Sequence, residues 1–205
     1  MVMLCLLTCP PAYMAVQQEI DAATASGRLS YPTATDVEAR ALPYLEAVLC
    51  EAMRMHPPSV SPSKLSPVET DSVCGFSVPG GTQVGANVPG VLQSEAVYGP
   101  DAGCFRPERW LEAAQEEDGH RLSRMKSSLD LVFGAGKFSC MGKAIAYMEV
   151  RKLFVEVRQS ILVQWVSANN VNSSCGDLTL RLSTARSRFT SSRLPLWWCT
   201  TSTYG

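Results

Sequence analysis

One stretch constrains the fold of this chain more than any other, and it reads Phe-Gly-Ala-Gly-Lys-Phe-Ser-Cys-Met-Gly over residues 133–142. Two glycines precede Cys140, a third follows it at Gly142, and a strongly helical run comes next. Because glycine lacks a Cβ atom, a bulky group can lie close to the main chain of this loop. The following helix brings free N–H groups and the positive end of its dipole next to the sulfur, which favours the thiolate. The stretch therefore predicts a metal ligand or a nucleophile at Cys140.

The side chains around Cys140 indicate what this loop would bind. Phe133, Phe138 and Met141 suit a flat, apolar cofactor. The whole run resembles the haem-binding signature of the cytochromes P-450, which reads Phe-Gly-x-Gly-x-Arg-x-Cys-x-Gly. Phe138 is the exception, because the family usually has Arg or His there. The other fixed positions are met by Phe133, Gly134, Gly136, Cys140 and Gly142.

This resemblance implies a bound haem b whose iron takes Cys140 as its axial thiolate ligand. Thiolate donation pushes electron density onto the iron and favours O–O cleavage. The resemblance also implies that Phe138 removes one partner of a haem propionate. Lys64 falls near the position where relatives often have an arginine that meets a propionate. A solvated surface lysine fits the sequence there equally well.

A second motif lies in the helix predicted over 42–55, which a Pro-Pro pair ends. Glu51 and Arg54 stand three residues apart in it, so they share a face and can pair. Taken alone, they read as a weak surface ion pair. With the His-Pro-Pro sequence that follows, they are similar to the Glu-x-x-Arg helix of the cytochromes P-450. The run Phe-Arg-Pro-Glu-Arg-Trp at 105–110 resembles another family segment, which implies that Arg109 completes a structural triad with Glu51 and Arg54.

The segments between these motifs predict short elements. Apolar residues at helical spacing predict a helix over 11–25 and a short helix over 91–98. The stretch 59–88 is rich in Pro, Ser, Gly and Val, and a Pro-Gly-Gly turn interrupts it. Short strands are expected there at 64–68, 72–78 and 82–88.

The segment 111–130 is rich in charge and is read as a loop. The clearest helix of the chain is predicted over 141–158. Charged residues flank or oppose its apolar face, and they are Glu149, Arg151, Lys152 and Glu156. The apolar face itself consists of Ala146, Tyr147, Val150, Leu153, Phe154 and Val157.

Together these features predict a mainly α fold with a small β sheet (α+β), and the resemblance makes it the C-terminal, haem-proximal part of the cytochrome P-450 fold. We expect a partial P-450 domain over residues 1–158 and a divergent tail over 159–205. In the tail, 161–166 and 178–182 are candidate strands, with disorder after them. A read-through or a shifted reading frame is our hypothesis for the origin of this tail.

Composition excludes several classes of function. A formal net charge of −1 gives no electrostatic case for binding nucleic acid or an anionic membrane surface. The 8 cysteines are scattered without Cys-x-x-Cys pairs, so they do not read as a zinc site or a secreted disulfide framework. The apolar opening at 1–9 is shorter than the ~20 residues of a membrane span, and it lacks the basic start of a signal peptide.

The resemblance implies an iron-dependent monooxygenase that inserts one oxygen atom from O2 into a small organic substrate, with electrons from a reductase. For a full-length relative it implies the endoplasmic reticulum membrane, reached through an N-terminal anchor that lies outside this sequence. The oxygen-handling distal helix of the family is also not among these residues. We therefore expect the isolated chain to lack oxygenase activity, and its substrate cannot be read from the sequence.

Two other readings stay open. In the first, the chain is a truncated or wrongly assembled gene product that at most binds haem and catalyses nothing. In the second, Cys140 is the nucleophile of a thiol enzyme. A nucleophilic cysteine usually needs a nearby base, and the sequence offers only His56 in the His-Pro-Pro turn and His120 in the charged segment.

Overall fold

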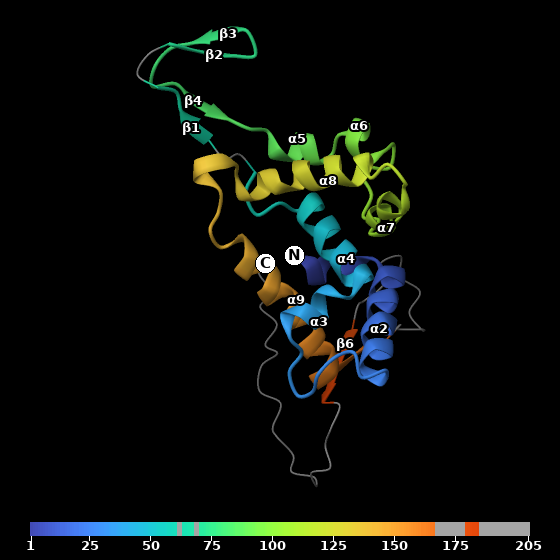
Figure 1. The fold of residues 1–205 in the computed structure, drawn as a ribbon. Helices are drawn as coiled ribbons and strands as arrows, with labels where there is room; N and C mark the ends of the chain where they lie inside the picture. The colour runs from blue at the N-terminus through green and yellow to red at the C-terminus, as the bar shows by residue number, and fades with distance from the viewer. Residues whose placement is uncertain (61–62, 68–69, 167–178, 185–205) are drawn as a thin grey trace, which may run out of the picture. The chain divides into compact units, whose positions relative to one another are not determined.

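The fold is given by a computed structural model that describes residues 1–60, 63–67, 70–166 and 179–184. The chain divides into two units, residues 1–156 and residues 157–205. Helices make up most of the first unit, and its four short strands lie together at one end (Figure 1). The prediction of a mainly α fold with a small amount of β structure is confirmed.

The elements follow one another in a simple order. Short 3-10 helices at Leu131–Phe133 and Gly136–Phe138 lie in the cysteine loop. The helices are α1 (Val2–Thr8), α2 (Pro10–Ala25), α3 (Asp36–Arg40), α4 (Pro43–Met55), α5 (Val88–Leu92), α6 (Glu95–Tyr98), α7 (Glu108–Gln115), α8 (His120–Asp130) and α9 (Lys143–Ser160). The strands are β1 (Ser63–Leu65), β2 (Asp71–Val73), β3 (Phe76–Val78), β4 (Gln83–Gly85), β5 (Ile161–Val166) and β6 (Thr179–Thr184).

Helix α4 is the central element of the first unit, and it packs against α1, α2, α5, α7 and α8. Its first turn contains Pro43, whose missing N–H costs nothing there. Glu19 of α2 accepts hydrogen bonds from the backbone N–H groups of Tyr44 and Leu45, at 2.8 and 2.9 Å. These contacts satisfy two of the N-terminal donors that a helix leaves unpaired. The helices predicted at 11–25 and 42–55 are both confirmed.

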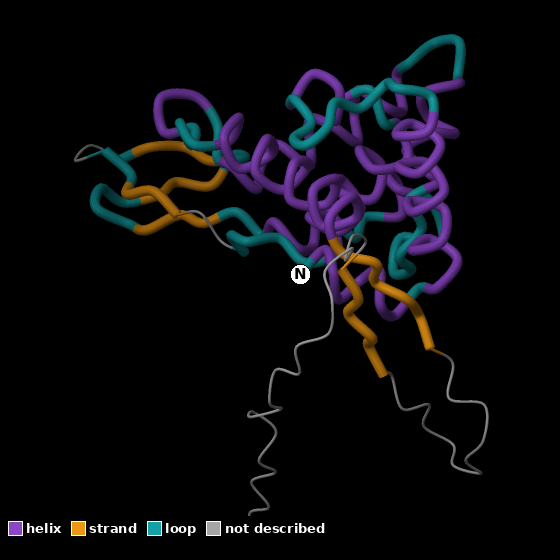
Figure 2. The backbone as a smooth tube through the Cα atoms, turned by 90° about the horizontal axis from the view of Figure 1, so that it is seen from below, coloured by secondary structure: helices purple, strands orange, loops and turns teal. Residues whose placement is uncertain are grey.

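The strand region differs from the prediction in detail. The segment expected as one strand at 72–78 is a hairpin of β2 and β3, and its turn has positive φ at both Cys74 (52°) and Gly75 (84°). Two consecutive positive φ values match the twist of a two-residue hairpin turn. β1 pairs with β4 in a separate two-stranded ribbon, so Figure 2 shows two antiparallel ribbons at this end of the first unit. The strand expected at 82–88 stops at Gly85, because Val88 already begins α5.

The reading of 111–130 as a loop is wrong, because α7 and α8 cover most of it. Met125 and Leu129 of α8 are buried in the core beside Tyr98. The Tyr98 hydroxyl lies 2.8 Å from Ser128 Oγ and 3.2 Å from the Met125 carbonyl oxygen. The helix predicted at 91–98 is instead two short helices, α5 and α6, which are separated at Gln93 and Ser94.

Helix α9 is found where the sequence predicts a helix, but its buried face is different. Leu153 was expected on the apolar face and is 58% exposed, whereas Val155 is fully buried. Arg151 was expected to flank or oppose that face and is only 7% exposed. Glu156 accepts a hydrogen bond from the backbone N–H of Ala34 at 3.0 Å. The buried face of α9 is therefore partly ionic, because Asp36 of α3 and Glu46 of α4 pair with Arg151.

In the second unit, β5 pairs antiparallel with β6. The strand predicted at 161–166 is confirmed, and the one predicted at 178–182 runs from residue 179 to residue 184. The disorder expected after these strands concerns residues outside those described. The domain boundary at 158 and the shifted reading frame stay predictions. None of the described helices has the length and apolar character that crossing a bilayer requires.

The polar centre of the core is the Glu51 carboxylate on α4, which is fully buried. Its Oε1 accepts hydrogen bonds from Arg54 Nη2 at 2.8 Å, Arg106 N at 2.9 Å and Arg109 Nε at 3.0 Å. Its Oε2 accepts from Arg54 Nε and from Trp110 Nε1, both at 2.9 Å. Five donors thus surround one buried carboxylate, and the structure brings Glu51, Arg54 and Arg109 into one group.

The remaining N–H groups of the two buried arginines mainly bind the carbonyl oxygens that end α5 and α6 and those of the irregular segment between α6 and α7. Arg54 and Arg109 each have all five N–H groups hydrogen-bonded, and Arg109 Nη1 also reaches Asp101 Oδ1 at 2.9 Å. Without these bonds the irregular backbone would leave buried carbonyl oxygens unpaired. The two arginines therefore supply the hydrogen bonds that a helix or sheet would otherwise provide. The carbonyl acceptors, 2.6 to 3.1 Å from the guanidinium nitrogens, are those of Leu92, Tyr98, Asp101, Ala102 and Cys104.

We expect Glu51→Gln to lower the free energy of unfolding by about 3–5 kcal/mol, because it leaves two buried guanidinium groups without their shared counter-charge. Urea denaturation followed by circular dichroism measures this loss. Glu112→Gln is the matched control, since Glu112 is an exposed partner of Arg106, and it should cost less than about 1 kcal/mol. A loss as small in Glu51→Gln would contradict the role of the carboxylate. If that variant does not fold, Trp110→Phe removes one donor and should cost about 1.5–3 kcal/mol.

Stability should also decline in acid. Burial opposes ionisation of Glu51, but the hydrogen bonds and charges of Arg54 and its neighbours outweigh it, so the pKa of Glu51 lies below its ordinary value of 4.5. Burial likewise opposes ionisation of Asp101, and Arg109 and Arg106 hold its pKa below 3.8. A lowered folded-state pKa stabilises the fold fully above the ordinary value, and this contribution is lost as pH falls through the folded value.

Urea titrations from pH 7 down to pH 3 should therefore show a falling free energy of unfolding below about pH 4.5, in the window given by these shifts. Asp101→Asn should make the decline shallower, because one depressed carboxyl is removed. Equal slopes in the two proteins would contradict the assignment of Asp101 to this network.

Candidate functional site

The loop that presents Cys140 is closed by its own backbone. The Cys140 N–H donates to the Phe133 carbonyl oxygen at 2.8 Å, and Ser139 N donates to Gly136 O at 3.0 Å. Gly134 and Gly136 have φ of 73° and 61°, in the region that residues with a Cβ rarely adopt. These glycines turn the chain sharply enough for Cys140 to meet Phe133 again just before α9.

The thiol of Cys140 is exposed at the surface of the first unit. A Cβ atom built on Gly142 would lie 3.6 Å from Sγ, which is an ordinary contact. Gly142 therefore keeps one flank of the sulfur uncovered, although the chain itself would leave room for a methyl group. The next residue, Met141, is 98% exposed, so the loop also presents a large uncovered apolar side chain.

Phe133 joins this loop to α9. Its ring lies 5.6 Å from the ring of Tyr147, centroid to centroid, and Lys143 Nζ lies 5.8 Å from the centroid of the Phe133 ring. Lys143 also pairs with Asp130 at the end of α8, at 2.6 Å. Both ends of the loop are thus held against the first two turns of α9.

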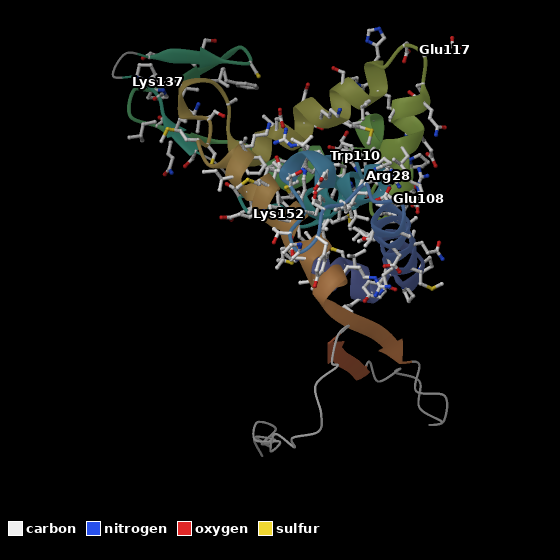
Figure 3. The ribbon with its side chains drawn as sticks, turned by 60° about the horizontal axis from the view of Figure 1, so that its bottom comes forward. Arg28, Glu108, Trp110, Glu117, Lys137 and Lys152 are labelled. Carbon is white, nitrogen blue, oxygen red and sulfur yellow. The ribbon has the colours of Figure 1, made fainter. Side chains whose placement is uncertain are left out.

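Lys64 reaches the same loop from β1. Its Nζ donates to the carbonyl oxygen of Ala135 at 3.4 Å, and the side chain is exposed. The labelled Lys137, also in the loop, lies at the end of the first unit where the strands are (Figure 3). Lys64, which is 71 positions from Ala135 in the sequence, thus adds a positive charge next to the glycines that precede Cys140.

Two hollows adjoin the loop. The first is a largely apolar cavity of about 300 Å³ between α4 and α9. Its walls include Leu49, Met53, Pro57, Phe133, Ala146 and Val150. The second, of about 530 Å³, contains Cys140 and is lined by charged side chains. These are Arg40, Glu46, Lys126, Asp130, Lys143 and Arg151.

The two histidines lie apart from the thiol. His56 lines the apolar cavity, and His120 is exposed at the start of α8. Neither is among the residues described around the hollow that contains Cys140. Among the described residues, the hollow that contains Cys140 is therefore lined by cations and carboxylates and by neither histidine.

Several residues of these networks were missed at the sequence level. Trp110 donates to Glu51, and Asp101 bridges Arg109 and Arg106. The motif 105–110 already contained Trp110, whose indole N–H is a ready donor for a buried carboxylate. Nothing local in the sequence marks Asp101, because its partners come from the segment that follows it.

Comparison with known proteins bears directly on this site. The family model described as Cytochrome P-450 matches residues 1–177. The chain is similar to cytochrome P-450 monooxygenase ABA1 of Pyricularia oryzae, with 38% identity over 153 residues, covering 74% of this chain and 29% of that protein. It is also similar to cytochrome P-450 monooxygenase cicH of Emericella nidulans, with 42% identity over 149 residues, covering 72% of this chain and 29% of that protein.

Solved structures agree on the fold. The crystal structure of the cytochrome P-450DA haem domain aligns with a TM-score of 0.66 and 18% identity, covering 90% of this chain and 40% of that one. The chain thus spans about three tenths of the length of the curated relatives it matches. Because the family model covers most of its length, including the Glu51 group and the Cys140 loop, the chain belongs to the cytochrome P-450 family.

Proposed function

We propose that this chain supplies the iron ligand and the proximal framework of a haem-dependent monooxygenase. Such an enzyme inserts one atom of O2 into a small organic substrate and takes electrons from a reductase. The observation that carries the proposal is the exposed Cys140 thiol, held in a glycine loop by the Cys140 N–H to Phe133 carbonyl bond of 2.8 Å. The similar proteins that are named monooxygenases support the same reaction class.

The residues present fit haem b in their chemistry. Cys140 offers an accessible sulfur donor, and Gly142 leaves the space beside it uncovered. The apolar cavity meets the loop at Phe133, and its walls suit the body of a porphyrin, whereas Cys140 itself lines the charged hollow. Lys64 offers an ammonium group for a propionate carboxylate, as a point charge without the planar fork of arginine.

In this proposal each of the site residues has a defined role. Cys140 would ligate the iron through its thiolate, and the backbone bond to Phe133 holds the main chain that carries the sulfur. Lys64 binds a propionate near the glycine turn. The bound haem supplies the iron at which O2 is reduced. Glu51, Arg54 and Arg109 hold the core and do not touch the reacting atoms.

For a longer protein that contains this chain, we propose the endoplasmic reticulum membrane as its location. The support is the family alone, and the described helices contribute no span.

Haem titration of the 205-residue chain tests the ligand. We expect the reduced, carbon monoxide-treated sample to show the red-shifted absorption of a thiolate-ligated haem, and we expect Cys140→Ser to abolish it because a hydroxyl does not replace the thiolate donor. Cys104→Ser is the matched control, since Cys104 is also an exposed thiol but lies outside the loop. An unchanged spectrum in Cys140→Ser, or no haem uptake by the parent chain, would contradict the proposal.

Turnover measured with a reductase then distinguishes a catalytic chain from one that only binds haem. Oxygenation of an organic probe by the haem-loaded chain would support a catalytic unit. Haem uptake without turnover would support the alternative of a non-catalytic product that only binds haem.

Lys64→Met should weaken haem binding about two- to fivefold, as expected for the loss of one exposed ion pair. Lys152→Met on α9 removes the same charge at a position with no described contact to the loop, and it should leave the dissociation constant unchanged. Equal affinities of the two variants for haem would contradict the assignment of Lys64 to the haem site.

A further inference from the structure

One face of α9 carries an uninterrupted row of interactions that starts at the cysteine loop and ends at the buried arginine. Lys143, Tyr147 and Arg151 are spaced four residues apart, so their side chains follow one another along the same face. The Arg151 guanidinium carbon lies 5.1 Å from the centroid of the Tyr147 ring, a cation–π contact. Arg151 and Tyr147 are thus in direct contact, and Lys143 is linked to Tyr147 through the Phe133 ring that both side chains meet.

At the far end of this row, Arg151 joins three helices. Its Nε and Nη2 donate to the two carboxylate oxygens of Glu46 on α4, the second at 3.0 Å. Its Nη1 donates to Asp36 on α3 at 3.4 Å. A two-pronged contact between a guanidinium and a carboxylate is directional, so it resists rotation of α9 about its axis. Arg151 is only 7% exposed, while the side chains of Glu46 and Asp36 are 28% and 20% exposed, so the pairing lies at the edge of the core.

At the near end, the row reaches the backbone of Cys140. Tyr147 packs against the Phe133 ring at 5.6 Å, and Lys143 lies over the same ring while pairing with Asp130. The Phe133 carbonyl in turn accepts the Cys140 N–H at 2.8 Å. The position of Phe133 therefore sets the position of the main chain that bears the sulfur.

We propose that Arg151 is a positioning residue for Cys140, acting through Tyr147 and Phe133. The inference rests on the proposed function for its consequence, since the sulfur is positioned for iron. Among the described residues, the hydrogen bonds, ion pairs and ring contacts of Arg151 are with Glu46, Asp36 and Tyr147, although it lines the same hollow as Cys140. Its pairing with Glu46 and Asp36 fixes the turn of α9 that presents Tyr147, and Tyr147 keeps Phe133 in place. Loss of the pairing releases the Cys140 to Phe133 bond while the rest of the core stays folded.

The first test uses amide hydrogen exchange of the haem-free 205-residue chain, resolved residue by residue. We expect Arg151→Gln to speed exchange of the Cys140 amide about tenfold relative to the Leu49 amide in α4, because local opening is reported separately from global unfolding. Arg151→Lys keeps the charge without the fork and should give an intermediate rate. An unchanged ratio of the two rates in Arg151→Gln would overturn the inference.

Two controls separate positioning from general destabilisation. Arg106→Gln removes an arginine that also pairs with two carboxylates, Asp101 and Glu112, but lies away from the loop. It should speed both amides alike. Tyr147→Phe keeps the ring and should retain the parent ratio, whereas Tyr147→Leu removes the ring contact and should behave like Arg151→Gln. If Tyr147→Leu had no effect, the route through the ring would be wrong.

A spectroscopic readout links the inference to haem. In the haem-loaded chain, Arg151→Gln should convert part of the red-shifted carbon monoxide complex into a form without thiolate ligation, and Arg151→Lys should restore part of it. If the parent chain takes up no haem, the proposed function fails, while the amide exchange experiment still decides the positioning of Cys140. If haem binds and the spectrum of Arg151→Gln equals that of the parent, the positioning role fails alone.

Discussion

The buried carboxylate of Glu51 is the interaction on which the first unit depends. A single ionised group in the core would be too costly to keep there, and here five donors from four residues compensate it. The two arginines that neutralise it also bind the carbonyls that end α5 and α6 and those of the irregular segment between α6 and α7. This segment therefore has a defined course without regular secondary structure. A well-packed apolar core could be as stable, but it would not satisfy that backbone.

Helix α4 carries two ionic networks that serve different parts of the chain. Glu51 and Arg54 connect α4 to the backbone around α6 and α7, whereas Glu46 connects α4 to Arg151 of α9. The apolar side chains between them, such as Leu45 and Leu49, pack the core. One helix thereby connects the structural group around Glu51 to the helix that follows Cys140.

The regions where prediction from the sequence was wrong share a cause. Residues 111–130 carry many charges, and charge alone favoured a loop, yet Leu122, Met125 and Leu129 repeat at helical spacing, and Met125 and Leu129 are buried. The hairpin of β2 and β3 was read as one strand over 72–78, although Cys74-Gly75 can form a two-residue turn. On α9, hydrophobicity favoured Leu153 for the buried face over Arg151. Hydropathy cannot indicate that carboxylates on α3 and α4 will meet an arginine and satisfy it.

The sequence by itself determined the local features: the helix that holds Glu51 and Arg54, the glycine turn before Cys140, and the helix that follows it. These depend on residue types within a few positions, where periodicity, proline and glycine act directly. The tertiary structure alone decided that Trp110 donates to Glu51, that Lys64 reaches Ala135, and that Arg151 is buried beside Glu46. Each of these contacts joins residues 59 to 105 positions apart. Their energy depends on geometry and desolvation, which exist only once the helices have packed.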